Sequence, residues 1–192
     1  SRFAKLNNGK ILIVSGNSSG QPNYGAAENQ ARLFDPLTDT WSTIPSPNNS
    51  TSVNLNASEL VTLNDGRVLI LHGKSISISN PGTGPTAFIQ DINPELYDPI
   101  TNSWAYTSND SNMGSIYDAV RLNNGQILIV GDKFLGFADL DNSPSSLEAN
   151  WVPYAEIFNP ATSSFYEINP NIRRYGNPRK LLVLSDGRVL LL

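Results

Sequence analysis

The stretch Leu122-Asn-Asn-Gly-Gln-Ile-Leu-Ile129 decides the fold, because the chain contains four versions of it. The other versions are residues 6–13, 63–70 and 184–191. An Asn-Gly or Asp-Gly pair supplies the positive φ angles that a type I′ turn needs, and it is the strongest short signal for a β-hairpin. Each version therefore predicts a hairpin, and the apolar run after the glycine predicts a strand that is covered on both faces.

A second unit recurs three times and predicts another pair of strands. Its fullest version is Glu95-Leu-Tyr-Asp-Pro-Ile-Thr-Asn-Ser-Trp104, and the others lie at 33–41 and 157–165. An Asp-Pro or Asn-Pro pair ends one strand, because proline has no N–H to donate to the ladder. An aromatic residue then follows in the next strand, and we expect these residues to pack between strands: Trp41, Trp104 and Phe165.

Both units share a period of roughly sixty residues, with four strands per period and no helical pattern. This is typical of a β-propeller built of four-stranded antiparallel blades, so the predicted fold class is all-β. We expect blades at 1–46, 58–108 and 117–169, and the first hairpin of a fourth blade at 179–192. Propellers close with about four to eight blades. The ring is therefore incomplete here, and its expected partner is the remainder of the propeller, in the same chain or in a partner chain.

The two units resemble the kelch repeats of the galactose-oxidase type, most closely at 95–104 and 156–165. The resemblance implies a kelch β-propeller that binds on the face carrying its long loops. The chain departs from the family pattern at the glycine pair that closes the second strand of each blade. The residues found there are Ser15-Gly16, His72-Gly73 and Gly131-Asp132.

The resemblance also raises an enzymatic interpretation. The copper-radical site of galactose oxidase uses a thioether-linked cysteine, tyrosines and two histidines, whereas this chain has no cysteine and one histidine, His72. An oxidase would need metal ligands outside these residues. The sequence predicts no catalytic residue, no metal ligand and no cofactor in this segment. A non-catalytic role is therefore favoured, and an enzymatic role stays an alternative.

Composition excludes further classes of function. The net charge of −4 gives no general attraction to nucleic acid or to an anionic membrane. No apolar run is long enough to insert into a bilayer. Five Asn-x-Ser/Thr sequons favour an extracellular or cell-surface location: Asn17, Asn48, Asn49, Asn56 and Asn109. Such sequons also arise by chance in a chain rich in asparagine and serine, so a cytoplasmic location stays open.

Loop lengths point to one face as the binding face. In an up-and-down blade, alternate connections lie on opposite faces, and here one set is short while the other is long. The long connections are 17–29, 74–93 and 132–153 within blades, and 42–58, 106–118 and 169–179 between them. Long loops on a rigid scaffold usually carry function.

The candidate ligand-binding residues are aromatic and charged side chains in or beside these loops. Exposed aromatic residues with polar tips suit sugar or peptide recognition, and arginine is a bidentate donor for carboxylate or sulfate. Structural ion pairs between blades are the alternative use of the arginines. The predicted set is Tyr117, Asp118, Trp151, Arg173, Arg174 and Tyr175.

Three functions follow from the sequence. The first is a non-catalytic module that binds a protein segment or a glycan through the long-loop face. The second is part of an extracellular carbohydrate or alcohol oxidase whose metal ligands lie elsewhere. The third is a structural propeller of a surface protein.

Overall fold

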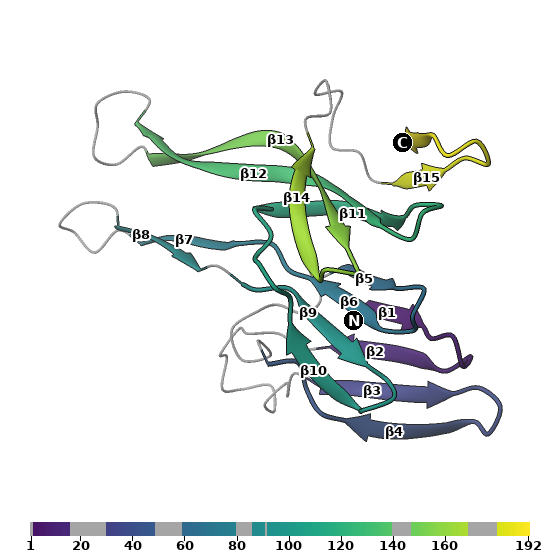
Figure 1. The fold of residues 1–192 in the computed structure, drawn as a ribbon. Helices are drawn as coiled ribbons and strands as arrows, with labels where there is room; N and C mark the ends of the chain where they lie inside the picture. Colours follow the sequence, from purple (N-terminus) through teal and green to yellow (C-terminus); the bar gives the residue numbers. More distant parts are fainter. Residues whose placement is uncertain are drawn as a thin grey trace.

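The computed structural model describes residues 2–15, 30–48, 59–79, 86–90, 92–139, 147–168 and 180–192. Every regular element in these ranges is a β-strand, which confirms the all-β prediction. The strands form three four-stranded antiparallel sheets and two two-stranded sheets (Figure 1). The sheets stand side by side in the manner of propeller blades.

Each four-stranded sheet is one blade. Blade 1 contains β1 (Arg2–Lys5), β2 (Ile11–Ser15), β3 (Gln30–Asp35) and β4 (Thr40–Ile44), in that order. Blade 2 contains β5 (Glu59–Thr62), β6 (Val68–Leu71), β9 (Glu95–Asp98) and β10 (Ser103–Tyr106). Blade 3 contains β11 (Ser115–Arg121), β12 (Ile127–Asp139), β13 (Leu147–Asn159) and β14 (Ser164–Ile168). The fourth hairpin pairs β15 (Leu181–Val183) with β16 (Val189–Leu191).

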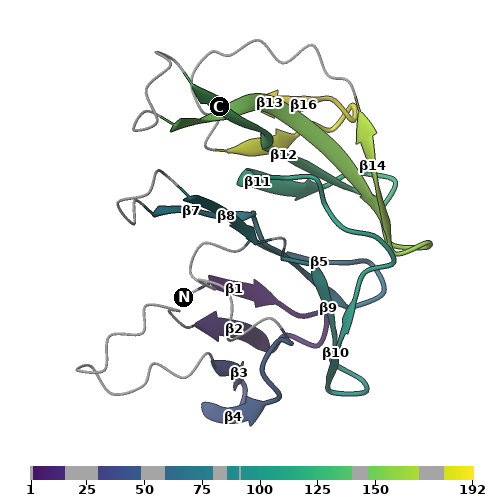
Figure 2. The same cartoon turned by 90° about the vertical axis from the view of Figure 1, so that its left-hand side faces the viewer.

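The first strands of successive blades are neighbours: β1 contacts β5, β5 contacts β11, and β11 contacts β15 (Figures 1 and 2). Side chains at one repeated position link these strands. Thr62 Oγ1 donates to the carbonyl of Lys5 at 2.8 Å, and Arg121 Nη1 donates to the carbonyl of Thr62 at 3.1 Å. Blades 2 and 3 are thus each tied to the preceding blade by a side chain that reaches back to its backbone.

The glycine turns are hairpin turns, as predicted, but their type differs from the expectation. Gly125 N donates to Leu122 O at 2.9 Å, and Leu122 N donates to Gln126 O at 2.8 Å. Within each of these turns only the glycine has a positive φ, +85° at Gly125. A type I′ turn would need two such residues, so the loop is a type I turn followed by a left-handed residue that forms a bulge. The glycine supplies that single left-handed position.

The Asp-Pro and Asn-Pro turns are stabilised by their own side chains. In blade 2 the Oδ1 atom of Asp98 accepts a hydrogen bond from the backbone N–H of Ile100 at 2.8 Å, and Asn102 takes the left-handed conformation with φ 51°. The hydroxyls of Thr101 and Ser103 lie 2.8 Å apart across the turn. Equivalent contacts recur in blades 1 and 3, which explains why this unit repeats in the sequence.

The hydrophobic core lies between adjacent blades. Ala4 and Leu12 of blade 1 pack against Val68, Ile70 and Tyr97 of blade 2. The same positions of blade 2 pack against blade 3, and those of blade 3 against the fourth hairpin. The inner strands of blades 2 and 3 are therefore covered on both faces, because each of these two blades has a neighbour on both sides.

Two buried glutamates at equivalent positions hold the segment that follows the preceding blade. Glu95, fully buried, accepts hydrogen bonds from the backbone N–H and the side-chain amide of Asn48 at 2.7 and 2.8 Å. Glu156 accepts hydrogen bonds from the Ser111 hydroxyl and from the Asn112 N–H, the latter at 3.2 Å. Burial raises the pKa of Glu156, and the two hydrogen bonds oppose that rise.

The repeated aromatic residues stack on their cross-strand partners, as predicted. Ring centroids are 5.0 Å apart for Tyr97 and Trp104 and 4.8 Å apart for Phe158 and Phe165. Phe165 is buried and Trp104 is half-buried, with its Nε1 donating to Pro45 O at 2.7 Å. Trp41 also stacks on its cross-strand partner Phe34, with ring centroids 4.9 Å apart. It is 58% exposed, since among the described residues no other blade lies against that side of blade 1.

Two stretches expected as long loops are partly strands. Within 74–93, β7 (Ser75–Ser79) and β8 (Thr86–Gln90) form a separate hairpin. Within 132–153, β12 and β13 continue their pairing as far as Asp139 and Leu147. Aromatic residues that face each other across the strands stabilise this extension, and a bulge beside Gly136 bends it.

Candidate functional site

The candidate site lies at the base of the β12–β13 extension. This extension and the β7–β8 hairpin project from the side opposite the short glycine turns (Figures 1 and 2). The predicted residues Tyr117 and Trp151 both belong here, on β11 and β13. The two faces inferred from loop lengths thus exist, although strand pairing builds much of the long-loop face.

Trp151 is held as a half-buried aromatic platform. Its ring lies 5.2 Å from that of Phe134 on the paired strand, and Phe134 lies 5.0 Å from Phe137. On its other side Trp151 rests on Gly114, where a Cβ atom would come within 2.0 Å of the Trp151 ring atom Cζ3. A larger residue at this position would push against the indole, so Gly114 leaves the space in which the Trp151 ring lies.

Tyr117 is positioned by an irregularity in its strand. Ile116 pairs with Gly131 and Asp118 with Val130, so Tyr117 is the extra residue of a β-bulge. A bulge re-aims a side chain out of the regular alternation. The Tyr117 hydroxyl donates to the carboxylate of Asp132, at the start of the β12 extension. The pair places a half-buried phenol and a carboxylate near the aromatic platform.

Asp118 has a different position from the one expected. It is 3% exposed, and its Oδ2 atom accepts a hydrogen bond from the backbone N–H of Leu181 at 2.5 Å. Its Oδ1 atom lies 3.3 Å from Lys180 Nζ. The carboxylate therefore ties the fourth hairpin to blade 3, and we remove Asp118 from the ligand-binding set. Its neighbour Tyr117 faces the site because the bulge separates the two side chains.

The basic part of the predicted site is not described. Arg173, Arg174 and Tyr175 lie outside the described residues, so their role stays a prediction.

A second cluster, on the opposite face of the same strands from the platform, was missed by the sequence reasoning. Lys133 Nζ lies 4.9 Å from the ring centroid of Tyr154 and 3.7 Å from Glu167 Oε2. Burial, followed by the charge of Glu156, raises the pKa of Tyr154 to about 12. The phenol therefore stays protonated, and it donates to Glu167 Oε2 at 3.4 Å. No motif links these residues, because only the register of β12, β13 and β14 brings them together.

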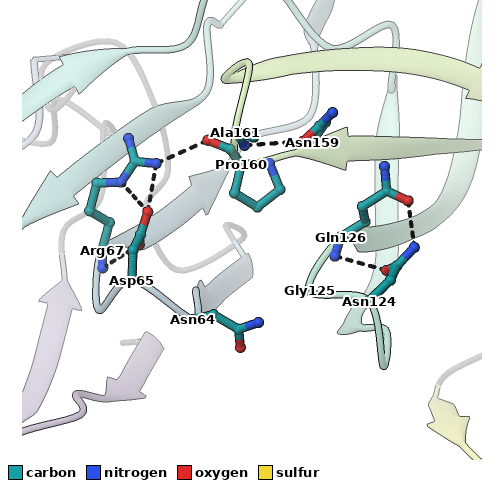
Figure 3. Close-up of a pocket in the computed structure, with 9 residues that line it drawn as sticks. All are labelled: Asn64, Asp65, Arg67, Asn124, Gly125, Gln126, Asn159, Pro160 and Ala161. Carbon is teal, nitrogen blue, oxygen red and sulfur yellow. Dashed lines mark hydrogen bonds and ion pairs between the residues drawn. The ribbon is translucent and has the colours of Figure 1, made fainter.

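An open hollow of about 400 Å³ lies on the other face, among the short turns of blades 2 and 3 (Figure 3). Several of its polar groups are used within the protein. Arg67 Nη2 lies 2.7 Å from Asp65 Oδ2 and donates to the carbonyl of Pro160 at 3.1 Å. The side chains of Asn124 and Gln126 bond each other at 2.8 Å. Although burial opposes it, hydrogen bonding from Arg67 lowers the pKa of Asp65. We interpret the hollow as a junction between blades.

Two further findings concern sites of other kinds. Among the described residues, no three side chains of the His, Cys, Asp and Glu types gather as metal ligands would. In the same ranges there is no helix with the length and apolarity needed to cross a membrane. His72, directly after β6, is buried, and burial lowers its pKa to about 4, so its imidazole is neutral at pH 7.

No family model and no curated protein sequence matches this chain. Three solved structures align with this chain at low sequence identity. MPT-4, a mannose phosphorylase from Leishmania mexicana, is 15% identical with a TM-score of 0.45, over 98% of this chain and 61% of that one. MPT-1, a GDP-Man-dependent mannosyltransferase from the same organism, is 13% identical with a TM-score of 0.42 and the same coverage. The extracellular domain of BT4673 from B. thetaiotaomicron is 10% identical with a TM-score of 0.27, over 96% of this chain and 30% of that one. This chain thus spans less than two thirds of each of these structures.

Proposed function

We propose that the chain is part of a kelch-type β-propeller that serves as a non-catalytic binding module. Its ligand is a protein segment or a glycan, and the binding surface is the long-loop face at the base of the β12–β13 extension. An extracellular or cell-surface location fits this function, and so do the sequons in the sequence.

The observation that carries the proposal is the platform formed by Trp151, Phe134 and Phe137. Indole and phenyl faces bury apolar C–H surface of a sugar or an aliphatic side chain at little cost in conformational entropy. Trp151 is only half-buried and rests on Gly114, so it offers a ring that is already ordered before binding. Pre-ordering of this kind improves affinity because less freedom is lost on association.

Polar groups beside the platform would orient the ligand. The carboxylate of Asp132, which accepts the Tyr117 hydroxyl, also has oxygen lone pairs for a sugar hydroxyl or a peptide N–H. A few polar groups around an aromatic surface are the usual composition of a small-ligand site.

The test begins with arrays of oligosaccharides and short peptides, on which the purified chain is screened. Calorimetry with the tightest ligand then compares wild type with Trp151→Ala, for which we expect a roughly 10- to 30-fold loss of affinity, as for an aromatic hot spot. Tyr106→Ala is the matched control, because Tyr106 is an aromatic residue that is 50% exposed on the outer strand of blade 2. Equal affinities of wild type and Trp151→Ala would remove the platform from the binding site.

A further inference from the structure

Blades 2 and 3 carry equivalent projections on the long-loop face. In blade 3 the second and third strands continue as the β12–β13 extension, and in blade 2 the β7–β8 hairpin takes its place (Figures 1 and 2). The hairpin keeps the register of β6 and β9, from which it projects. Its first pair, Ser75 and Gln90, occupies the positions that Phe134 and Trp151 hold in blade 3. The repeat thus allows the two projections to be compared strand by strand.

The bases of the two projections meet at Gly114. The backbone N–H of Lys74, directly before β7, donates to Gly114 O at 2.8 Å, and Gly114 N donates to Asp132 O at 2.7 Å. A Cβ atom at Gly73 would come within 2.5 Å of Gly114 O. The β7–β8 hairpin therefore begins at a defined position next to the residue on which Trp151 rests.

The β12–β13 extension is protected against pairing with a further strand. Its β12 edge carries Lys133 and the bulge beside Gly136, and its β13 edge carries Pro153, which has no N–H to donate. Charged residues, bulges and prolines are the features by which proteins keep sheet edges from pairing with other chains. Both edges of this projection therefore disfavour strand addition.

The β7–β8 hairpin has none of these protective features. Its strands, Ser75-Ile-Ser-Ile-Ser79 and Thr86-Ala-Phe-Ile-Gln90, contain no charged residue and no proline, and their pairing has no register shift. They form a two-stranded sheet of their own, so neither has a second partner strand among the described residues. A lone two-stranded hairpin is marginally stable in water, and a third strand stabilises it. An unprotected edge of this kind is a template for another strand.

We propose that the β7–β8 hairpin binds an extended polypeptide segment, which adds to it as a third strand. An unpaired strand edge presents a row of N–H and C=O groups, and an extended polypeptide backbone carries the complementary row, whereas a sugar ring does not. Strand addition rests on the proposed function, in that the long-loop face binds the ligand, and it narrows that ligand to a protein segment. It does not require the Trp151 platform.

The first test uses the purified chain and the tightest peptide from the array, methylated at one backbone nitrogen at a time. In an added strand, alternate N–H groups point to the hairpin. Methylation at alternate positions should therefore weaken binding about tenfold, while the intervening positions should change it by less than about twofold. Losses without this alternation, or an array that returns only oligosaccharides, would overturn strand addition. An array without any ligand would contradict the proposed function as well.

The second test changes the hairpin itself. Ser77→Pro places a proline at the centre of β7, where it removes a backbone donor and disturbs the pairing with β8. Because the hairpin is a sheet separate from the blades, we expect unchanged urea unfolding of the blades and a loss of peptide affinity of about tenfold or more. The matched control, Ser77→Ala, keeps the backbone donor and should bind within about twofold of wild type.

The Trp151→Ala variant separates this proposal from the platform. Full peptide affinity in Ser77→Pro, together with a loss in Trp151→Ala, would retain the platform and overturn strand addition. A loss in Ser77→Pro, together with full affinity in Trp151→Ala, would support strand addition and remove the platform from the binding site.

Discussion

His72 should make the stability of the fold depend on pH in a calculable way. Burial lowers its pKa from 6.5 to about 4, while in the unfolded chain the imidazole titrates at its ordinary value. Between these two pH values the unfolded state binds a proton that the folded state does not, so the free energy of unfolding falls as the pH falls. The contribution is fully present above pH 6.5 and is lost on the way down to about pH 4.

The magnitude follows from the pKa shift. The linkage relation gives a loss of roughly 2–3 kcal/mol between pH 7.5 and pH 4.5, which is a large fraction of the stability of a small domain. Glu59 and Glu156 act in the opposite direction, because burial raises the pKa of each and their protonation favours the folded state. Their effect is common to wild type and to a variant at His72, so it cancels in the difference.

The assay is urea denaturation, followed by tryptophan fluorescence, of wild type and His72→Gln across this pH range. His72 is the only histidine, so no second imidazole complicates the comparison. We expect the free energy of unfolding of the variant to fall by roughly 2–3 kcal/mol less than that of wild type on acidification. Parallel curves for the two proteins would refute the reasoning, because they would mean that His72 titrates equally in the folded and unfolded states.

Three further predictions concern blade packing and the loop face. Trp104→Ala should lower the free energy of unfolding by about 2–4 kcal/mol, somewhat less than truncation of a fully buried aromatic residue, whereas Trp41→Ala should lower it by under about 1 kcal/mol in dilute solution. Equal losses for the two variants in denaturant titrations would contradict the packing described above. Glu156→Ala should lower the free energy of unfolding by about 2–4 kcal/mol, because it removes two hydrogen bonds to a buried carboxylate. A melting temperature unchanged from wild type would mean that Glu156 does not stabilise the junction between blades 2 and 3. Arg174→Ala should weaken an anionic ligand by about 1.5–3 kcal/mol, while Asp39→Asn on the short-turn face should leave affinity unchanged by calorimetry.

The repeats predict the blades because their signals are local. Gly125 and its equivalents fix the hairpin turns through a single backbone angle, and Asp98 stabilises its turn through a hydrogen bond two residues away. Such features act within a few residues, so the sequence reveals them directly. Their period then gives the number of blades within residues 1–192 and the number of strands in each blade.

The contacts between blades could not be predicted in the same way. Asp118 binds the backbone of Leu181, and Glu95 binds Asn48, so both pairs join residues far apart in the sequence. Nothing local distinguishes such buried carboxylates from surface ones. Trp151 was identified from its type and loop position, but Phe134 and Gly114 were not, because the platform depends on the register of the β12–β13 extension.

Hydrogen–deuterium exchange with the tightest array ligand tests the central claim, that binding occurs on the long-loop face. We predict slowed exchange on ligand addition at residues 114–117, 132–137 and 150–154, which surround Trp151. The turns around Asp39, Asp65, Asn102 and Ser163 on the opposite face should exchange as they do without ligand. Protection confined to those short turns, with none around Trp151, would contradict the account.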